Sequence, residues 1–491
     1  MAMNVFPLLS AIVLLPFLGG LAALAFKDSP GGCRSLCLLV TALDLLLALF
    51  TLPWLAGPGG VLFERFAWIA PFDIHYHLAL DGVSFLLVIM TCFLGLLAVV
   101  VSWREIQERV ASYHFFLLLI QASALGVFLA RDLFLFYLFW ELQLIPLFFL
   151  IGVWGHAQRQ HAAMKFFLFS IAGGLLMFLS VIGLYLLHGA QTGLYTFSLD
   201  ELASRPVAGA TQAWLLAGFL LSFGVKTPIF PLHSWLPDAH TEAPTAGSLV
   251  LAGVILKTGT YALLRWAFPL FPQAAAQAAP WLAALGVAAL FYAAWIALAQ
   301  SDLKRLIAYS SIGHMGLIVL GVAVWDSISL EGSVLQMVNH GLTTGGLFIM
   351  AGMLAERTGT RRMHELGGLW TKAPAFSGIF LLLGLASAGL PGLNNFVGEI
   401  LILVGSFRQY PAAAVLGFVA LVFTLIYVLR LIQATLFGPS EPDAPFDDLT
   451  ARESAILVPI VLAVLFLGLV PGPALDLMNA PIEELLSLWM E

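Results

Sequence analysis

Apolar positions form long unbroken segments along the chain, and polar residues gather in the short connections between them. A helix needs about 20 apolar residues to cross a bilayer core of roughly 30 Å, and runs such as residues 86–101 lack the alternation of a barrel strand. The pattern predicts an all-α integral membrane protein with about 14 transmembrane helices. We expect these spans at residues 5–26, 33–56, 82–103, 113–131, 133–153, 164–188, 213–235, 244–268, 279–300, 304–324, 333–355, 374–406, 411–437 and 453–472.

The seventh and twelfth predicted spans carry residues that interrupt a helix. Three prolines lie within residues 223–240, and Gly389 and Pro391 lie in the sequence ASAGLPGLNN. Spans four to eight and nine to thirteen therefore read as two five-helix repeats of opposite orientation. Paired interrupted helices in inverted repeats are typical of a transport site near the membrane midplane. The predicted domains are residues 1–112 with the first three helices, 113–270 and 271–437 with the two repeats, and 438–491 with a C-terminal helix and tail.

The composition agrees with a membrane protein, because 61% of the 491 residues are hydrophobic and 10% are charged, against roughly 25% charged in soluble domains. The first span lacks the basic leader and cleavage pattern of a signal peptide, so we expect it to be retained. Most of the 21 lysines and arginines fall in connections after odd-numbered spans, which places both termini outside the cytoplasm. No basic patch or RNA-binding motif indicates a nucleic acid partner.

Four ionisable side chains lie within the apolar segments: Glu141, Lys226, Lys257 and Glu399. A charge at the bilayer centre costs at least ~2.5 to 3.5 kcal/mol, so such residues usually move or sense charge. Lys226 directly precedes the first proline of the interrupted seventh span, and Glu141 lies well inside the fifth span. A carboxylate beside a buried lysine keeps the ammonium charged, so the pair would switch the lysine between holding and releasing a proton. The alternatives are a static buried ion pair and a carboxylate neutralised by burial.

Lys257 lies deep in the eighth span, and His314 and His340 lie in two further apolar helices. Histidine titrates near neutrality and passes protons between its ring nitrogens, so we interpret these residues as a relay. Glu399 follows the second interruption beside two asparagines, where hydration would let a carboxylate exchange protons with water. Snorkelling of Lys257, packing roles for the histidines and a helix-capping role for Glu399 are the alternatives.

Motifs for nucleotide or electron chemistry are absent from the sequence. It has no Walker A loop, no GxGxxG after a strand, no HExxH and no cysteine cluster for iron and sulfur. The three cysteines indicate neither a disulfide framework nor a metal site. We therefore expect no cofactor and no metal in this chain, and any energy source other than an ion gradient has to come from a partner.

Three segments resemble the antiporter-like subunits of respiratory complex I, the proton-pumping NADH:quinone oxidoreductase. They are FWELQLIPLFFLIGVWG, the run from Phe223 to Arg265, and SDLKRLIAYSSIGHMG. The resemblance covers nearly the whole chain. The M-type subunits resemble it most, because they have glutamate at the position of Glu399, where the other types have lysine, and lack a long lateral helix after the fourteenth span. The roles that the resemblance implies are a regulating ion pair of Glu141 and Lys226, a central relay at Lys257, a bridge of His314 and His340, and an exit group at Glu399.

The resemblance also implies an assembly and a location. The chain would be a subunit of a proton-pumping enzyme in the bacterial cytoplasmic membrane, with both termini on the periplasmic side and no redox centre of its own. Its partners would be the neighbouring L-type and N-type subunits, other complex I subunits and the lipid bilayer. NADH, FMN, iron–sulfur clusters and quinone would belong to partner subunits. The alternatives are a subunit of a multisubunit sodium/proton antiporter or membrane-bound hydrogenase, a passive scaffold, and a transporter of an organic solute.

Overall fold

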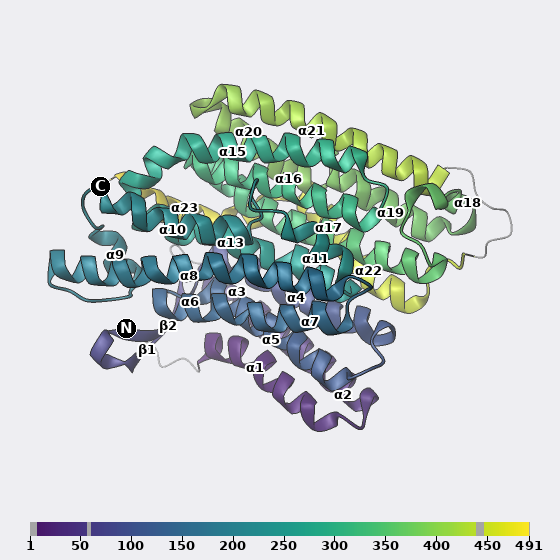
Figure 1. Ribbon diagram of the computed structural model, residues 1–491, viewed down its shortest axis with the longest axis horizontal. Coiled ribbons are helices and arrows are strands. Elements are labelled where there is room, and N and C mark those ends of the chain that lie inside the picture. Colours follow the sequence, from purple (N-terminus) through teal and green to yellow (C-terminus); the bar gives the residue numbers. More distant parts are fainter. Residues whose placement is uncertain (1–6, 56–59, 438–445, 491) are drawn as a thin grey trace. The chain divides into compact units, whose positions relative to one another are not determined.

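The computed structural model describes residues 7–55, 60–437 and 446–490, with side chains up to residue 487. Most of these residues are helical, which confirms the predicted all-α class (Figure 1). The chain divides into two compact units. The first unit comprises Met1–Thr227, Lys257–Ala279 and Leu477–Glu491, and the second comprises Pro228–Leu256 and Pro280–Asp476.

Eleven helices among the described residues are long and apolar enough to cross a membrane. Each coincides with one of the predicted spans. The seventh and twelfth spans are divided into shorter helices, and the eleventh is a long helix, α17 (Ser327–Thr358), whose polar residues lower its hydropathy. The pairing of the spans into inverted repeats stays a prediction. The eleven helices are Leu8–Phe26, Pro30–Leu55, Gly82–Glu105, Val110–Leu129, Leu133–Trp154, Arg159–Thr192, Thr245–Leu270, Pro272–Ala299, Leu303–Val324, Pro411–Phe437 and Ala451–Leu469.

The first unit is built around α5, which packs against α1, α2 and α4 and also against α6 and α7. The helix α8 packs on α7 and α10, and Figure 1 shows it as a long helix. The helices of the first unit are α1 (Leu8–Ala23), η1 (Leu24–Phe26), α2 (Pro30–Phe50), α3 (Leu52–Leu55), α4 (Gly82–Glu105), α5 (Val110–Leu129), α6 (Leu133–Leu142), α7 (Leu144–Trp154), α8 (Arg159–Thr192), α9 (Leu199–Ser204), α10 (Thr211–Lys226), η4 (Leu263–Ala267) and α14 (Phe268–Leu270), with the short 3-10 turn η2 (Ala70–Phe72).

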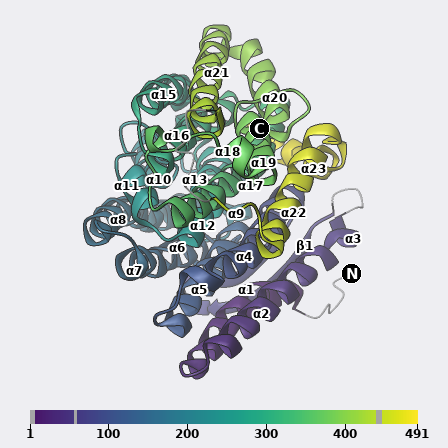
Figure 2. The same ribbon diagram turned by 90° about the vertical axis from the view of Figure 1, so that its right-hand side faces the viewer.

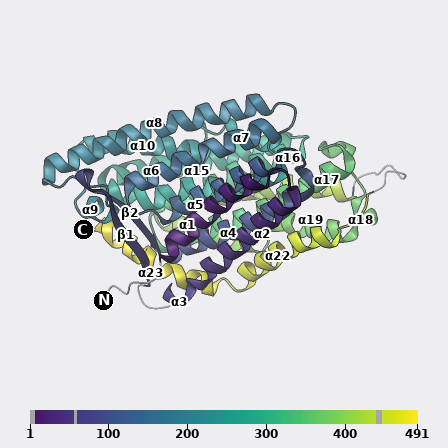
Figure 3. The ribbon, with the colours of Figure 1, turned by 90° about the horizontal axis from the view of Figure 1, so that it is seen from below.

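A two-stranded antiparallel hairpin lies between the second and third spans of this unit, and the sequence reading missed it. It consists of β1 (Leu62–Ile69) and β2 (Ile74–Leu80) (Figure 3). The Glu64 carboxylate accepts hydrogen bonds from the backbone N–H groups of Leu9 at 2.6 Å and Ser10 at 3.1 Å. The hairpin thereby satisfies two amides that the first turn of α1 leaves unpaired. After β2, Asp81 and Ser84 form a capping box that starts α4.

The second unit is built around α17, which packs against α16, α19, α20 and α22. The packing between α17 and α20 is close, because a Cβ on Gly332 would lie 2.7 Å from the Ile402 backbone nitrogen. Figure 2 shows α20 beside α21, which the contacts between the two helices support. The elements of the second unit are α11 (Trp235–Glu242), α12 (Thr245–Val250), η3 (Leu251–Ile255), α16 (Leu303–Val324), α17, η5 (Met363–Glu365), α18 (Leu369–Lys372), α19 (Pro374–Ser387), α20 (Asn394–Gln409), α21 (Pro411–Ile432), η6 (Gln433–Phe437) and α22 (Ala451–Leu469).

Three helices contain residues of both units. They are α13 (Leu256–Ala262), α15 (Pro272–Ala299) and α23 (Gly472–Met490). Because α13 follows η3 and precedes η4, the eighth span contains two π-helical turns, which the apolar pattern did not predict.

Both predicted interruptions occur. The helix α10 ends at Lys226, and α11 begins only at Trp235, because the prolines between them lack the N–H that a helix needs. The helix α19 ends at Ser387, and α20 begins at Asn394. In between, Gly389 and Gly392 have φ values of 71° and 90°. Glycine reaches these left-handed conformations without the steric penalty of a Cβ.

Three expectations from the sequence differ from the structure. Residues 472–490, predicted as part of a tail, form α23. Arg265, which lies within the predicted eighth span but is not among the four ionisable residues singled out from the sequence, is buried in η4, where the Asp81 carboxylate binds it at 2.5 Å. Asp44, which the reading of buried ionisable residues omitted, lies fully buried in α2.

Candidate functional site

Lys226 is the last residue of α10 and is 3% exposed. Its ammonium group donates to the Gln143 side-chain oxygen at 3.0 Å and to the Trp140 carbonyl oxygen at 3.3 Å. It also lies 4.5 Å from the centroid of the Trp140 ring, which attracts cations through its electron-rich face. Neutral groups therefore hold this ammonium inside the first unit.

Glu141 lies near the end of α6, just before Gln143 separates α6 from α7. Pro146 accounts for this break, because proline cannot donate the hydrogen bond that would join the two helices. The half-buried Glu141 carboxylate packs on Gly174 of α8, where a Cβ would lie 1.9 Å from Oε1. Glu141 interacts electrostatically with Lys226, but none of the described ion pairs joins the two. The predicted pair therefore interacts through space and not through a direct ion pair, and its switching role stays a prediction.

Lys257 is fully buried in α13, between the π-helical turns η3 and η4. Such turns widen a helix by one residue per turn and are frequent at functional sites. Gly259 brings α13 against the end of α10, because a Cβ there would lie 2.8 Å from the Thr227 backbone nitrogen. Thr227 directly follows Lys226. The two segments that bear Lys226 and Lys257 are therefore packed closely within the first unit.

The second unit brings His314, His340 and Glu399 together from α16, α17 and α20. The His314 Nδ1 atom lies 3.4 Å from the Glu399 Oε1 atom, and the ring centroids of the two histidines are 5.4 Å apart. All three residues are at most 3% exposed. The arrangement agrees with the predicted bridge of histidines beside a carboxylate, and its role in proton transfer stays a prediction.

The interruption before α20 shapes the site around Glu399. A Cβ on Gly389 would lie 2.2 Å from the Glu399 Oε2 atom, so the glycine leaves room for the carboxylate. The Gln336 side-chain amide donates to Oε1 at 3.5 Å. The Asn339 amide donates to the Asn394 backbone oxygen at 2.7 Å, and the Asn394 amide donates back to the Asn339 backbone oxygen at 3.1 Å. These paired amides hold the start of α20 against α17.

The sequence reading missed the neutral polar residues that surround the ionisable ones. Gln143, Gln336 and Asn339 are fully buried in otherwise apolar segments. An amide side chain within an apolar span is costly unless it is hydrogen-bonded, so its presence was a usable signal. Within the described residues, no group of three histidine, cysteine, aspartate or glutamate side chains is placed to hold a metal ion.

Comparison with known proteins identifies the family of this chain. A profile of the family described as "NADH:quinone oxidoreductase/Mrp antiporter, TM" matches residues 130–424. The NADH-quinone oxidoreductase subunit M of Pseudomonas aeruginosa is 43% identical over 487 residues, covering 96% of this chain and 95% of that protein. The chain belongs to the subunit M branch of this family. Subunit M of Escherichia coli K12 is 40% identical over 501 residues and covers 97% of both chains.

Among solved structures, this member of the subunit M branch is similar to a chain of respiratory complex I from Thermus thermophilus. The TM-score is 0.90 at 33% identity, and the alignment covers 98% of this chain and 99% of that one. The family profile extends over all the residues predicted for proton transfer: Glu141, Lys226, Lys257, His314, His340 and Glu399.

Proposed function

We propose that this chain is a proton-translocating, antiporter-like subunit in the membrane arm of an NADH:quinone oxidoreductase. The observation that carries the proposal is the buried cluster of His314, His340 and Glu399 beside an interrupted helix. The chain would lie in the bacterial cytoplasmic membrane with its termini on the periplasmic side. Neighbouring L-type and N-type subunits would be its partners. NADH, FMN, iron–sulfur clusters and quinone would belong to other subunits.

In the first unit, Lys226 is the group whose protonation would change. Neutral oxygens and a ring face solvate its ammonium, and Glu141 is the nearby negative charge. If Glu141 is neutralised or drawn away, the buried ammonium loses its counter-charge and releases its proton. The half-buried position of Glu141 supports this role, because a charge change in a neighbouring subunit can act on it.

Lys257 would receive that proton. Its neighbouring segment packs directly on the end of α10 through Gly259. The π-helical turns on both sides add local freedom to α13, since their hydrogen bonds can shift register by one residue. A buried lysine suits a relay because its neutral form is accessible once the group is desolvated.

In the second unit, His314 would pass protons between His340 and Glu399. An imidazole accepts a proton at one ring nitrogen and donates from the other, and His314 contacts one partner through Nδ1. Glu399 sits against the glycine of an interrupted helix, where freed backbone groups need water or protein partners. It is therefore the group best placed to exchange a proton with water.

The energy required is of the size that buried charges can supply. Moving one charge against 100 mV costs ~2.3 kcal/mol. Two unit charges 4 Å apart interact by about 4 kcal/mol at an effective dielectric constant near 20. Quinone reduction elsewhere in the complex would drive the first change of charge, and the row of buried side chains would pass it along.

The test uses membrane vesicles that contain the assembled complex. We expect Lys226→Ala to slow NADH-driven proton pumping roughly tenfold or more, because one lost relay group adds at least ~1.4 kcal/mol to the barrier of a step. Fluorescence quenching of a pH-sensitive dye reports the pumping, and a native gel reports assembly. Lys27→Ala is the matched control, since Lys27 is exposed. Unchanged pumping in an assembled Lys226→Ala complex would favour a passive scaffold and refute the proposal.

The family description also covers Mrp antiporters, so a sodium/proton antiporter subunit is the second candidate. Vesicles that contain the chain's complex but are supplied with no NADH distinguish the two. Sodium-driven proton exchange under those conditions would support the antiporter, and its absence together with NADH-driven pumping supports the proposed function.

A further inference from the structure

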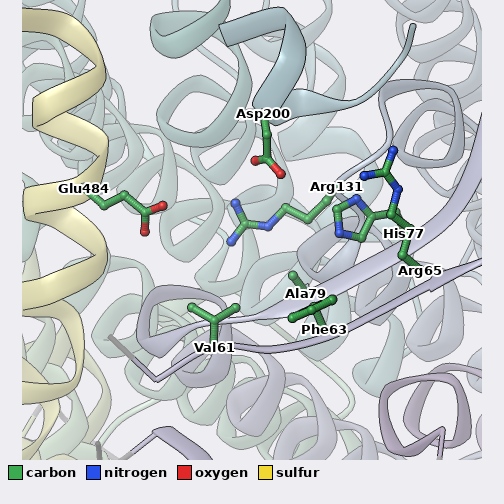
Figure 4. A pocket seen from close by; sticks show the side chains of 8 residues that line it. All are labelled: Val61, Phe63, Arg65, His77, Ala79, Arg131, Asp200 and Glu484. Atoms are coloured by element: carbon green, nitrogen blue, oxygen red, sulfur yellow. The ribbon is translucent and has the colours of Figure 1, made fainter. Parts of the chain in front are cut away.

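One face of the β1–β2 hairpin lines a polar cavity of about 260 Å³ in the first unit. Phe63 pairs with Ala79 and Arg65 with His77 across the two strands, so these four side chains share that face. Figure 4 shows the other charged walls: Arg131, Asp200 from α9 and Glu484 from α23. None of these residues belongs to the proposed proton relay.

The cavity lies where membrane-spanning helices end. The strand β2 leads directly into α4, Arg131 lies between α5 and α6, and α9 follows α8. On β1, Phe63 is 61% exposed, and Phe66 and Trp68 are each more than half exposed. Exposed aromatic rings at helix ends are typical of the membrane–water boundary. The cavity is therefore at the level of lipid headgroups.

Opposite charges balance in and directly behind this cavity. The Arg131 guanidinium donates to the Asp81 carboxylate at 2.6 Å, and Arg265 donates to the same oxygen at 2.5 Å. With Arg65, Asp200 and Glu484, the cluster holds three arginines and three carboxylates. A ligand with a net charge would disturb this balance, whereas a zwitterion would not.

His77 supplies a further polar group to the cavity. It is 7% exposed, and its buried Nδ1 atom has no hydrogen-bond partner among the described residues. Burial lowers the pKa of His77 to about 4, with Asp200 opposing the shift and Arg65 and Arg131 adding to it. The imidazole is therefore neutral at physiological pH, and a neutral imidazole donates one hydrogen bond through the ring nitrogen that carries its proton.

We propose that this cavity binds the phosphoethanolamine headgroup of a phospholipid, with the phosphate toward Arg65 and His77 and the ammonium toward Asp200 and Glu484. Arginine and a neutral imidazole both donate to phosphate oxygens. Two carboxylates suit a primary ammonium, which has three N–H donors, better than a choline group, which has none. The acyl chains would follow Phe63, the exposed aromatic side chain on the cavity face of β1.

The test uses the purified complex, freed of lipid and given phosphatidylethanolamine with a photoreactive group on its acyl chains. Mass spectrometry then quantifies labelling of peptides from residues 61–80. We expect Arg65→Gln and Asp200→Asn each to lower this labelling about tenfold, as the loss of one charge-assisted hydrogen bond of roughly 1.4 kcal/mol predicts. Arg205→Gln is the matched control, because Arg205 is exposed and does not line the cavity.

Competitors decide which part of the lipid is recognised. Unlabelled phosphatidylethanolamine should displace the probe better than phosphatidylcholine or phosphatidylglycerol. Equal displacement by all three, or equal labelling of Arg65→Gln and Arg205→Gln, would overturn the proposal. Soluble glycerophosphoethanolamine that competes as well as the lipid would overturn it in favour of a water-soluble phosphate ester. Cross-links from the hairpin to a neighbouring subunit without lipid labelling would overturn it in favour of a protein partner. The proton-pumping result for Lys226→Ala has no bearing on any of these outcomes.

Discussion

Among individual side chains, the two carboxylates of the proposed relay each lie against a glycine. Glu141 packs on Gly174, and Glu399 packs on Gly389. An added Cβ would lie 1.9 Å from a carboxylate oxygen in the first case and 2.2 Å in the second, so both glycines define where the carboxylates can be. Carboxylate position matters because electrostatic coupling to a buried cation depends steeply on distance and surroundings.

Gly174→Ala tests this positioning role. The added methyl group would meet the flexible end of Glu141, which can move, and alanine is about 1 kcal/mol more favourable than glycine within a helix. We therefore expect normal assembly with a lowered yield of pumped protons per NADH, measured by dye quenching in vesicles. Gly152→Ala is the control, because its Cβ would only make ordinary contact with Ala163 at 3.4 Å. Equal pumping by the two variants would show that the position of Glu141 is not critical.

Among the helices and strands, carboxylates from distant segments cap helix N-termini. Glu64 of β1 caps α1, and Asp448 accepts from the Ala375 and Phe376 N–H groups at 2.9 Å and 2.8 Å at the start of α19. Helix N-termini carry partial positive charge and unpaired amides, so an acidic side chain stabilises them even when it comes from elsewhere in the chain. Caps of this kind cannot be found by inspecting the residues around the helix.

Glu64→Gln keeps the shape of the cap of α1 and removes its charge. We expect a loss of about 1 kcal/mol of local stability, the usual size of a cap contribution. Hydrogen exchange of the α1 amides in the purified complex measures it, and faster exchange is the expected result. Asp28→Asn, at an exposed site beyond the other end of this span, should leave the exchange unchanged. Similar exchange in both variants would contradict the capping role.

The cap of α19 should depend on pH. Burial raises the pKa of Asp448, but the N–H groups of Ala375, Phe376 and Leu449 outweigh it, and the net effect lowers the pKa. A lowered pKa in the folded state gives stability that is complete above the unfolded value of about 3.9 and is lost as the pH falls through the folded value. We expect the protection of the first α19 amides, which is the intrinsic exchange rate relative to their own rate at the same pH, to fall below that range and to change little above it.

Asp448→Asn should remove most of this dependence. Asp447→Asn is the matched control, because Asp447 is exposed and accepts from Arg357 through its backbone oxygen, which the substitution does not change. Identical acid sensitivity in the two variants would refute the assignment to Asp448.

Over the whole molecule, an ion pair between residues 184 positions apart belongs to a buried cluster that joins distant parts of the first unit. Asp81 precedes α4, Arg131 precedes α6, and Arg265 lies in η4, 184 residues from Asp81. Burial raises the pKa of Asp81, but Arg265 and Arg131 outweigh this and hold it well below its ordinary value. The carboxylate therefore stays ionised at all physiological pH values, and its contribution to stability is lost only in strong acid.

Asp81→Asn should destabilise this unit strongly, because it leaves two buried arginines without their shared counter-charge. Breaking a buried pair in this way costs roughly 3 to 5 kcal/mol. We expect less assembled complex on a native gel and inactivation at a lower temperature. Asp73→Asn, at a side chain that is 42% exposed, should assemble normally. Normal heat resistance of Asp81→Asn would show that the cluster does not hold the unit together.

The membrane class, the positions of the spans and the two interruptions could be predicted from the sequence, because they depend on local properties. These properties are the length of an apolar segment, the missing N–H of proline and the missing Cβ of glycine. Glu141, Lys226, Lys257 and Glu399 could be found in the same way, because a charged side chain in an apolar segment is conspicuous without knowledge of any neighbour.

Which groups meet could be learned only from the folded chain. The 3.4 Å contact joins His314 and Glu399, which are 85 positions apart in the sequence. The face of the hairpin that lines the polar cavity depends on the register of the two strands. Such contacts depend on how helices and strands pack and not on the residues beside them in the chain. For that reason, no local pattern of hydrophobicity along the chain predicts these contacts.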